Sequence, residues 1–205
     1  MKNLSFYLLT VLFLGLSSLA FAQDITVNSD VDRAPKFKGK PSNPEKFLDK
    51  YMNYPEEARL DIIEGVVNVS FMVTNDGKLM EPQIEKSVDP LLDSEALRLV
   101  SLMQEWKPAK KGGEFVDARV SLSVPFELSR EEKEFFQLLK NKGLKDKMPL
   151  FVIDDKIVKE YIRLPQYNVK SIRVMKGQKA IDRFGPEAKN GVVIVTTKRG
   201  TPPVK

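Results

Sequence analysis

Two stretches in which every second side chain is apolar constrain the fold of this chain more than any other feature. The first runs from residue 65 to 74 and the second from 117 to 126. Their apolar members are Val67, Val69, Phe71 and Val73 in the first stretch, and Ala118, Val120, Leu122, Val124 and Phe126 in the second. A two-residue period is typical of a strand with one face on a core and the other facing outward. Both stretches are therefore predicted to be half-buried strands of one sheet.

Turn and helix signals complete the pattern between these strands. Asp76-Gly77 predicts a hairpin, because tight turns need a positive φ, and residues 79–88 should form the returning strand. Asn43-Pro44 and Asp89-Pro90 predict helix starts, since in each case a capping side chain precedes a proline in the first turn. A further helical turn is predicted at 56–62.

The helix that starts at Asp89 should end at Trp106-Lys107-Pro108, because proline cannot continue the hydrogen-bond ladder. Its apolar stripe of Leu92, Ala96, Val100 and Met103 predicts packing on the sheet. Residues 34–128 are thus predicted to form an α+β domain, a small three-stranded antiparallel sheet with helices on one face and exposed edges.

The composition excludes several classes of site. The 205 residues include no cysteine and no histidine, which removes disulfides, thiolate nucleophiles, Ser-His-Asp triads and imidazole metal sites. No catalytic residue, metal site or cofactor is therefore assigned, and a binding module is favoured over an enzyme. Residues 23–140 carry a net charge of −5 and residues 141–205 one of +9. The basic part could bind an acidic surface, but its evenly scattered lysines favour solvated faces, and nucleic acid is not an expected partner.

The first residues predict the route of export. Lys2 precedes an apolar run from Phe6 to Leu16, and Ala20 and Ala22 form an A-x-A cleavage site. Residues 1–22 are therefore predicted to be a cleaved signal peptide that directs the protein to the periplasm, followed by a polar arm at 23–33. The alternative is a retained anchor in the inner membrane, since the stretch without a charge approaches the length of a membrane span.

The C-terminal part is predicted to form a second, smaller module. Ser129 is a helix N-cap and Gly143 a helix end, so residues 129–147 are predicted to contain a linker helix. Apolar segments at 149–154, 169–175 and 191–197 predict strands, and 178–184 a helix that stops at Gly185. Residues 148–200 are thus predicted to be a small α/β module, with 201–205 as a tail.

Six short motifs, in this order, resemble the C-terminal domain of TonB proteins. They are Tyr54-Pro55-Glu56-Glu57-Ala58-Arg59, Glu64-Gly65-Val66-Val67, Asn75-Asp76-Gly77, Ser87-Val88-Asp89 with Leu92-Asp93 and Glu95-Ala96-Leu97, Trp106-Lys107-Pro108-Ala109, and Val124-Pro125-Phe126. The resemblance implies a periplasmic domain that binds the TonB box, a short extended peptide of an outer-membrane receptor, by adding it as a strand to its sheet. In the family an inner-membrane helix and a long proline-rich linker precede this domain, whereas here only residues 23–32 intervene.

The strand at 117–126 is the predicted binding edge. It is the last strand of an open sheet, and β-augmentation draws affinity from the main-chain groups of such an edge. The predicted partner-binding residues on it are Arg119, Val120, Ser121, Leu122 and Ser123. The family resemblance adds Tyr54 and Pro55 as a second contact, and an aromatic ring packed on a proline where a helix starts is the structural alternative.

A second resemblance concerns residues 148–200. The order Pro149-Leu150-Phe151-Val152-Ile153-Asp154, Ile172-Arg173-Val174-Met175-Lys176-Gly177, Phe184-Gly185 and Asn190-Gly191-Val192-Val193-Ile194-Val195-Thr196-Thr197-Lys198-Arg199-Gly200 is similar to the plug domain of TonB-dependent outer-membrane receptors. Together the two resemblances imply a TonB-system protein of a Bacteroidetes-type envelope, linked to energy-dependent nutrient import. Its expected partners are the receptors, with a homodimer as a further hypothesis, and inner-membrane motor proteins if the N-terminus is retained.

Two other functions remain as alternatives. One is a stand-alone envelope interaction or assembly module in which the plug-like tail binds the ligand. The other is a small hydrolase that uses the paired carboxylates Asp154-Asp155, although adjacent strand residues point to opposite faces and a strand-end turn is the favoured interpretation. A basic cluster, Lys107, Lys110 and Lys111 beside Trp106, is interpreted as cations at a helix C-terminus rather than as a phosphate site.

Overall fold

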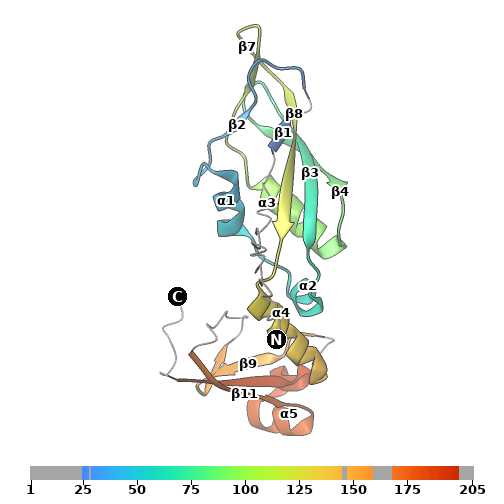
Figure 1. Cartoon of the computed structure of the whole chain (residues 1–205), viewed down its shortest axis with the longest axis vertical. Helices are drawn as coiled ribbons and strands as arrows, with labels where there is room; N and C mark the ends of the chain where they lie inside the picture. The colour runs from blue at the N-terminus through green and yellow to red at the C-terminus, as the bar shows by residue number, and fades with distance from the viewer. Residues whose placement is uncertain (1–24, 28, 145–146, 159–167, 199–205) are drawn as a thin grey trace, which may run out of the picture.

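The computed structural model of the chain describes residues 25–27, 29–144, 147–158 and 168–198 (Figure 1). The predicted signal peptide at 1–22 lies outside these residues. The described residues form two lobes along the long axis of the molecule, with helix α4 (Arg130–Asn141) between them. The first lobe contains the two alternating strands, and the second contains the C-terminal module.

A four-stranded antiparallel sheet forms the centre of the first lobe. Its strand order is β1-β8-β3-β4, made of β1 (Ile25–Val27), β3 (Gly65–Val73), β4 (Leu79–Lys86) and β8 (Ala118–Phe126). The sheet therefore has one strand more than the three predicted, because the N-terminal arm adds β1 to the edge of β8. A strand of three residues carries too short a periodicity to be recognised in the sequence.

The two long central strands pair without any shift in register, from Gly65 opposite Phe126 to Val73 opposite Ala118. All of their predicted inward residues are buried, and all except Ala118 pack with the apolar residues of helix α3 (Pro90–Ser101) in one core. Helices α1 (Pro44–Tyr51) and α2 (Glu56–Asp61) cover the same core. The helices thus lie on one face of the sheet, as predicted.

Helix α3 ends at Ser101, earlier than the predicted end at Trp106-Lys107-Pro108. Trp106–Lys107 instead forms β5, which pairs with β2 (Lys36–Phe37). The indole of Trp106 is buried against Phe37 and Phe71, with ring centroids 5.4 and 5.3 Å away, and its N–H donates to the Met103 carbonyl at 2.5 Å. Tertiary packing of this tryptophan therefore overrides the helical pattern.

Glycine-containing turns connect the strands where the sequence indicates them. Gly77 has φ +85°, and a Cβ at this position would lie 2.4 Å from the Trp106 carbonyl oxygen, so the turn between β3 and β4 requires glycine for both its conformation and its packing. Gly112 and Gly113 form the turn of a small hairpin between β6 (Ala109–Lys111) and β7 (Glu114–Val116). This hairpin lies at the end of the first lobe that is farthest from the second (Figure 1).

The second lobe has a mixed four-stranded sheet with strand order β10-β9-β12-β11. Its strands are β9 (Leu150–Ile153), β10 (Lys156–Val158), β11 (Val169–Met175) and β12 (Val192–Thr197), and β12 runs parallel to β9. Helix α5 (Gln178–Phe184) and the 3₁₀-helix η2 (Pro186–Asn190) pack on one face, and α4 packs on the other. Burial on both faces explains why β12 has a continuous apolar run rather than an alternating one.

Helix α4 differs from the linker helix predicted at 129–147. It begins with the predicted cap, because Ser129 and Glu132 form a reciprocal capping box. Its side chains Phe136 and Leu139 are completely buried, and they share one core with Leu60 of α2 and the apolar residues of β9 and β12. The helix is therefore a packed layer between the two lobes.

Candidate functional site

The predicted binding edge, β8, forms hydrogen-bonded pairs on both sides over part of its length. On one side it pairs with β3 along all nine residues, and on the other with β1 over three. In the second pair Ile25 lies opposite Leu122, Thr26 opposite Ser121 and Val27 opposite Val120. The expectation of an open edge at 120–122 is therefore wrong, since the chain's own N-terminal arm occupies these positions.

The side chains predicted for this edge divide between the two faces of the sheet. Val120 and Leu122 are fully buried in the core, as the alternation predicts. On the opposite face Ser121 Oγ donates to Glu85 Oε2 at 2.7 Å, and Ser123 Oγ donates to Asn68 Oδ1 at 3.2 Å. Arg119 lies 3.5 Å from Glu81 in an ion pair. These contacts run across the sheet, so a strand added at the edge would meet β8 mainly through its main chain.

The other long edge of this sheet, β4, is irregular. Its pairing with β3 shifts register twice, Glu81 has φ +51°, and Pro82 provides no backbone N–H. Bulges and prolines are devices by which proteins keep an edge from pairing with another strand. The edge of β8 has no such interruption in its pairing with β3.

The N-terminal arm, defined here as residues 25–27 and 29–33, continues from β1 toward the β6–β7 hairpin. Ser29 Oγ accepts a hydrogen bond from the backbone N–H of Arg119 at 3.0 Å. Asp30 Oδ2 lies 2.8 Å from the ammonium of Lys111, and Asp32 Oδ2 accepts from the N–H of Gly112 at 2.6 Å. The Lys111 ammonium holds the pKa of the Asp30 carboxyl below its ordinary value of 3.8 through a hydrogen bond and its charge.

Backbone hydrogen bonds attach the C-terminal end of the arm to β6. The N–H groups of Asp32 and Arg33 donate to the Lys110 carbonyl at 2.8 and 3.1 Å, and the Lys110 N–H donates back to Arg33 at 2.9 Å. Lys110 and Lys111 thus belong to a strand that anchors the arm. The interpretation of these lysines as cations at a helix C-terminus is wrong, because α3 ends well before them.

Tyr54, the predicted second contact, is buried. Its ring lies edge-on to Phe126 at 5.7 Å between centroids, the Arg59 guanidinium lies 5.0 Å from its centroid, and its hydroxyl donates to the Ile63 carbonyl. Burial, with the nearby Glu64 carboxylate, raises the pKa of Tyr54 above its ordinary value. This environment favours the packing interpretation for Tyr54, while Pro55 beside it remains partly exposed.

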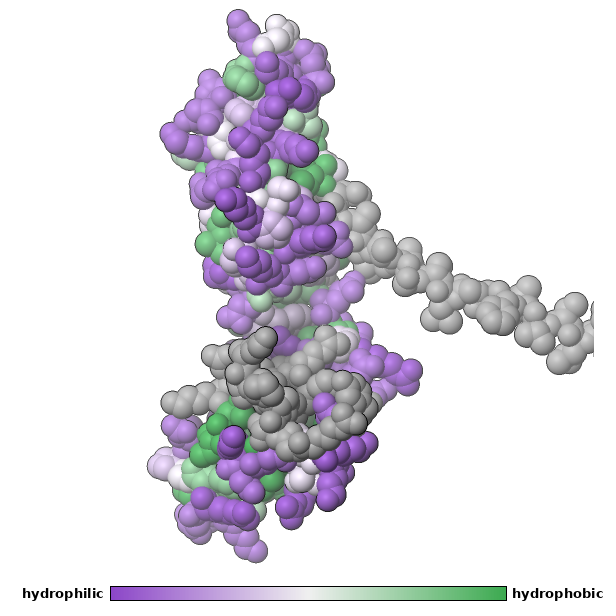
Figure 2. All heavy atoms as spheres, turned by 90° about the vertical axis from the view of Figure 1, so that its left-hand side faces the viewer, coloured by the Kyte–Doolittle hydropathy of each residue, from purple (hydrophilic) through white to green (hydrophobic). Residues whose placement is uncertain are grey.

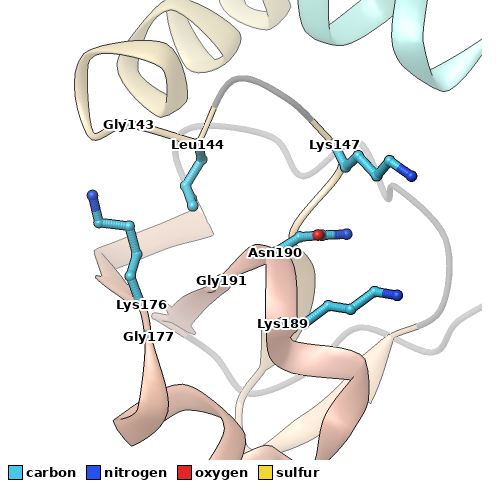
Figure 3. Close-up of a pocket in the computed structure, with 8 residues that line it drawn as sticks. All are labelled: Gly143, Leu144, Lys147, Lys176, Gly177, Lys189, Asn190 and Gly191. Atoms are coloured by element: carbon cyan, nitrogen blue, oxygen red, sulfur yellow. The ribbon is translucent and has the colours of Figure 1, made fainter.

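The second lobe contains a pocket of about 210 Å³ lined by three lysines, Lys147, Lys176 and Lys189 (Figure 3). Figure 3 shows Lys176 on one side of the pocket, below the end of α4, and the other two lysines on the far side. Lys176 Nζ donates to the Lys142 carbonyl at 2.6 Å, so this cation caps the C-terminal turn of α4. The side chains of Lys147 and Lys189 extend away from Lys176, so their positive charge lies at the outer side of the pocket (Figure 3).

Asp154 stands in a tight turn between β9 and β10. One of its carboxylate oxygens accepts from the Thr197 N–H at 2.8 Å, and the other accepts from the Thr197 hydroxyl at 2.6 Å. Both Asp154 and Asp155 have positive φ, at 45° and 64°. The favoured interpretation of this pair as a strand-end turn is confirmed. Among the described residues there is also no group of three carboxylates that could hold a metal ion.

On the face shown in Figure 2 the described residues are predominantly hydrophilic, with small apolar patches rather than a continuous one. No helix of the described residues is long and apolar enough to cross a membrane.

Sequence reasoning missed β1 as part of the site. The available signal was the triplet Ile25-Thr26-Val27, three β-branched residues directly after the predicted cleavage site, which favour a strand. So short a segment is normally read as part of a loop, and its partner lies about 95 residues away in the sequence.

Comparison with known proteins gives one family match, which lies within the first lobe. Residues 50–128 match the family model described as the Gram-negative bacterial TonB protein C-terminal. Among solved structures, the NMR solution structure of Helicobacter pylori TonB-CTD is similar, with 23% identity and a TM-score of 0.32, over 42% of this chain and 78% of that chain. No curated protein matches the chain. The resemblance of residues 148–200 to plug domains finds no support in these comparisons.

Proposed function

We propose that this chain, whose residues 50–128 form a TonB C-terminal domain, is a non-enzymatic periplasmic protein that binds TonB-dependent receptors of the outer membrane. The family match carries the proposal, because TonB C-terminal domains act with such receptors in transport. The ligand would be an extended segment of the receptor, or its plug domain. Binding would link this protein to energy-dependent nutrient import.

The binding mode that we propose is β-augmentation at the edge of β8. Three features support it: β8 is long, it pairs with β3 without a shift, and its inward side chains are fully buried in the core. Because β8 is fixed by β3 and by the core, the strand paired with its outer edge can be replaced by another while β8 itself stays in the sheet. The contrast with the irregular edge of β4 favours this side over the other.

A photo-crosslinking experiment tests the site. A crosslinking residue at Ser123, beside the three positions that pair with β1, should capture the periplasmic N-terminal peptide of a receptor in intact cells. The matched control is Gln83 on β4, which is exposed at the opposite edge and should not capture it. Asn68 is unsuitable as a control because it contacts Ser123 directly. Equal capture at both positions, or none at Ser123, would overturn the proposed edge.

The location of the protein can be tested independently. The periplasmic assignment depends on cleavage of residues 1–22, so the mature protein should begin at Gln23 and appear in the soluble periplasmic fraction. N-terminal sequencing of the purified protein and fractionation of the cells measure both. A retained leader in the membrane fraction would instead favour an anchored protein that contacts inner-membrane motor proteins.

The lysine-lined pocket favours a second candidate function. In that alternative the protein is an envelope interaction module whose second lobe binds an anionic ligand next to Lys147 and Lys189. A pull-down from envelope extracts distinguishes the two functions. A Lys147→Ala/Lys189→Ala variant should still recover receptors if the β8 edge is the binding site, and should lose its partners if the pocket is.

A further inference from the structure

The N-terminal arm and an external peptide would need the same hydrogen-bonding groups on β8. We infer that the arm is an intramolecular competitor: β1 closes the receptor-binding edge and must detach before an external strand can pair there. This inference rests on the proposed function, because it regulates the same site. It predicts that binding takes place by strand exchange.

The geometry makes the two occupants mutually exclusive. A strand within a sheet has only two edges, and β3 takes one edge of β8 along its whole length. On the other edge, Ile25, Thr26 and Val27 lie directly opposite residues 122, 121 and 120 at the middle of the strand. An added peptide that runs along β8 cannot pass this point while β1 is in place.

The attachment of β1 is suited to reversible opening. The strand has only three residues, Ile25 and Val27 are half-buried, and Thr26 is exposed. Short segments with few buried contacts and exposed backbone hydrogen bonds open locally at a small fraction of the free energy of global unfolding. By contrast, β8 keeps its pairing with β3 and the packing of its inward side chains on the helices when β1 leaves.

The other end of the arm is held more firmly and would act as the hinge. Asp30 and Asp32 bind Lys111 and Gly112, and three backbone hydrogen bonds join residues 32 and 33 to Lys110. Beyond them, β2 pairs with β5. The arm would therefore open from β1 and remain attached near the hairpin, so that it can close again when the peptide leaves.

The arm also indicates what kind of peptide would displace it. Ile25 and Val27 place β-branched side chains toward the core beside Leu122 and Val120, and Thr26 lies between them on the outer face. A displacing peptide should therefore carry apolar β-branched residues at alternate positions with a small polar residue between. It should also be longer than three residues, because each additional pair along β8 adds main-chain hydrogen bonds that β1 does not make.

A reversible lock tests the competition. The chain contains no cysteine, so a Thr26→Cys/Ser121→Cys variant of the mature chain offers one disulfide between directly opposed residues. The probe is a labelled synthetic peptide of a receptor's periplasmic N-terminal segment, measured by fluorescence anisotropy. Oxidation should weaken binding at least about tenfold, a difference of about 1.4 kcal/mol, and reduction should restore it. The two single-cysteine variants are the controls and should show no redox dependence.

A second variant tests the opposite direction. Asp30→Ala/Asp32→Ala removes the side-chain anchors of the arm and should tighten binding of the same peptide severalfold. Asp49→Ala removes a carboxylate of α1, outside the arm, and should not change the binding. Equal binding by the oxidised and reduced forms of the lock would overturn the competition while leaving the proposed function in place. If neither the unmodified chain, nor either form of the cysteine variant, nor Asp30→Ala/Asp32→Ala bound the peptide, both the competition and the proposed function would be overturned.

Discussion

The guanidinium of Arg59 on α2 lies 2.6 Å from Oε1 of Glu132 on α4, and this ion pair joins the two lobes. The second oxygen of Glu132 accepts hydrogen bonds from the N–H and hydroxyl of Ser129 at 3.0 and 2.9 Å. Arg59 also lies over the ring of Tyr54, which packs on Phe126 of β8. Contacts are thus continuous from the central sheet of the first lobe to the helix that covers the second.

We expect this junction to couple the unfolding of the two lobes. Arg59→Ala should cost about 1–3 kcal/mol, because it leaves the nearly buried Glu132 carboxylate without its cation. Arg130→Ala removes an exposed ion pair of the same helix and should change the stability by less than about 0.5 kcal/mol. Guanidinium denaturation measures both, followed by the fluorescence of the single tryptophan in the first lobe and by circular dichroism. Non-coincident transitions in the unmodified chain would show that the lobes unfold independently.

Limited proteolysis gives a second test of the same junction. The sequence predicts that a protease cuts within 129–147 and leaves two resistant fragments, whereas the packing of α4 leads us to expect protection from 130 to 141. Phe136 and Leu139 lie in a core shared with Leu60, and Lys133 and Lys140 form ion pairs with Glu64 and Asp61 of the first lobe. Mass spectrometry of trypsin fragments would identify the cuts. Early cleavage after Lys133 or Lys140 would restore the linker interpretation.

Local patterns predicted most elements of both lobes. The alternation at 65–74 and 117–126 indicated the strands and their inward faces, and the caps at Asn43, Asp89 and Ser129 indicated where helices begin. These features depend on neighbouring residues, so the sequence contains them directly. The end of α3 was placed too late because the position of Trp106 is decided by Phe37 and Phe71, which are distant in the sequence.

The candidate site could be predicted only in part, because some of its features depend on residues that are distant in the sequence. The strand β8 and its side-chain directions follow from its own alternation, but its occupancy by β1 depends on a pairing between opposite ends of the first lobe. Likewise, the sequence contains the Tyr54-Pro55 motif directly, but the burial of the Tyr54 ring depends on Phe126 and Arg59. Periodicity identifies which face of a strand is buried, and only tertiary structure identifies what lies at its edge.

The turn at Asp154 provides a test between structure and catalysis. Asp154→Asn keeps a residue that tolerates positive φ but places an amide donor where Thr197 donates, so we expect a loss of about 1–3 kcal/mol in stability. Asp155→Asn, at the exposed neighbour, should stay within about 0.5 kcal/mol. Thermal unfolding measures the difference. If a broad activity screen found turnover, and Asp154→Asn abolished that turnover without loss of stability, a carboxylate-based hydrolase would be favoured instead.

The attachment of the arm should weaken in acid, and Asp30 is the group responsible. The pKa of its carboxyl is lowered in the folded protein by the hydrogen bond and charge of Lys111, to which Asp32 also lies close. Because the pKa of Asp30 is lowered in the folded protein, its carboxylate contributes fully to the attachment of the arm at a pH above the ordinary pKa of 3.8. This contribution disappears as the pH falls through the pKa of Asp30 in the folded protein. The amide resonances of Thr26 and Ser121 should therefore move together in an NMR titration from pH 6 to 2.

An Asp30→Asn variant provides the control for this titration. It should already show the acid-state resonances of Thr26 and Ser121 at neutral pH and should lose their dependence on acid. The hairpin residue Asp76, whose pKa Lys78 and Thr74 lower to about 2, should titrate unchanged in both proteins and so report that the sheet is still folded. If Thr26 and Ser121 respond to acid equally in Asp30→Asn, the aspartate does not control the arm, because the response then comes from another carboxylate.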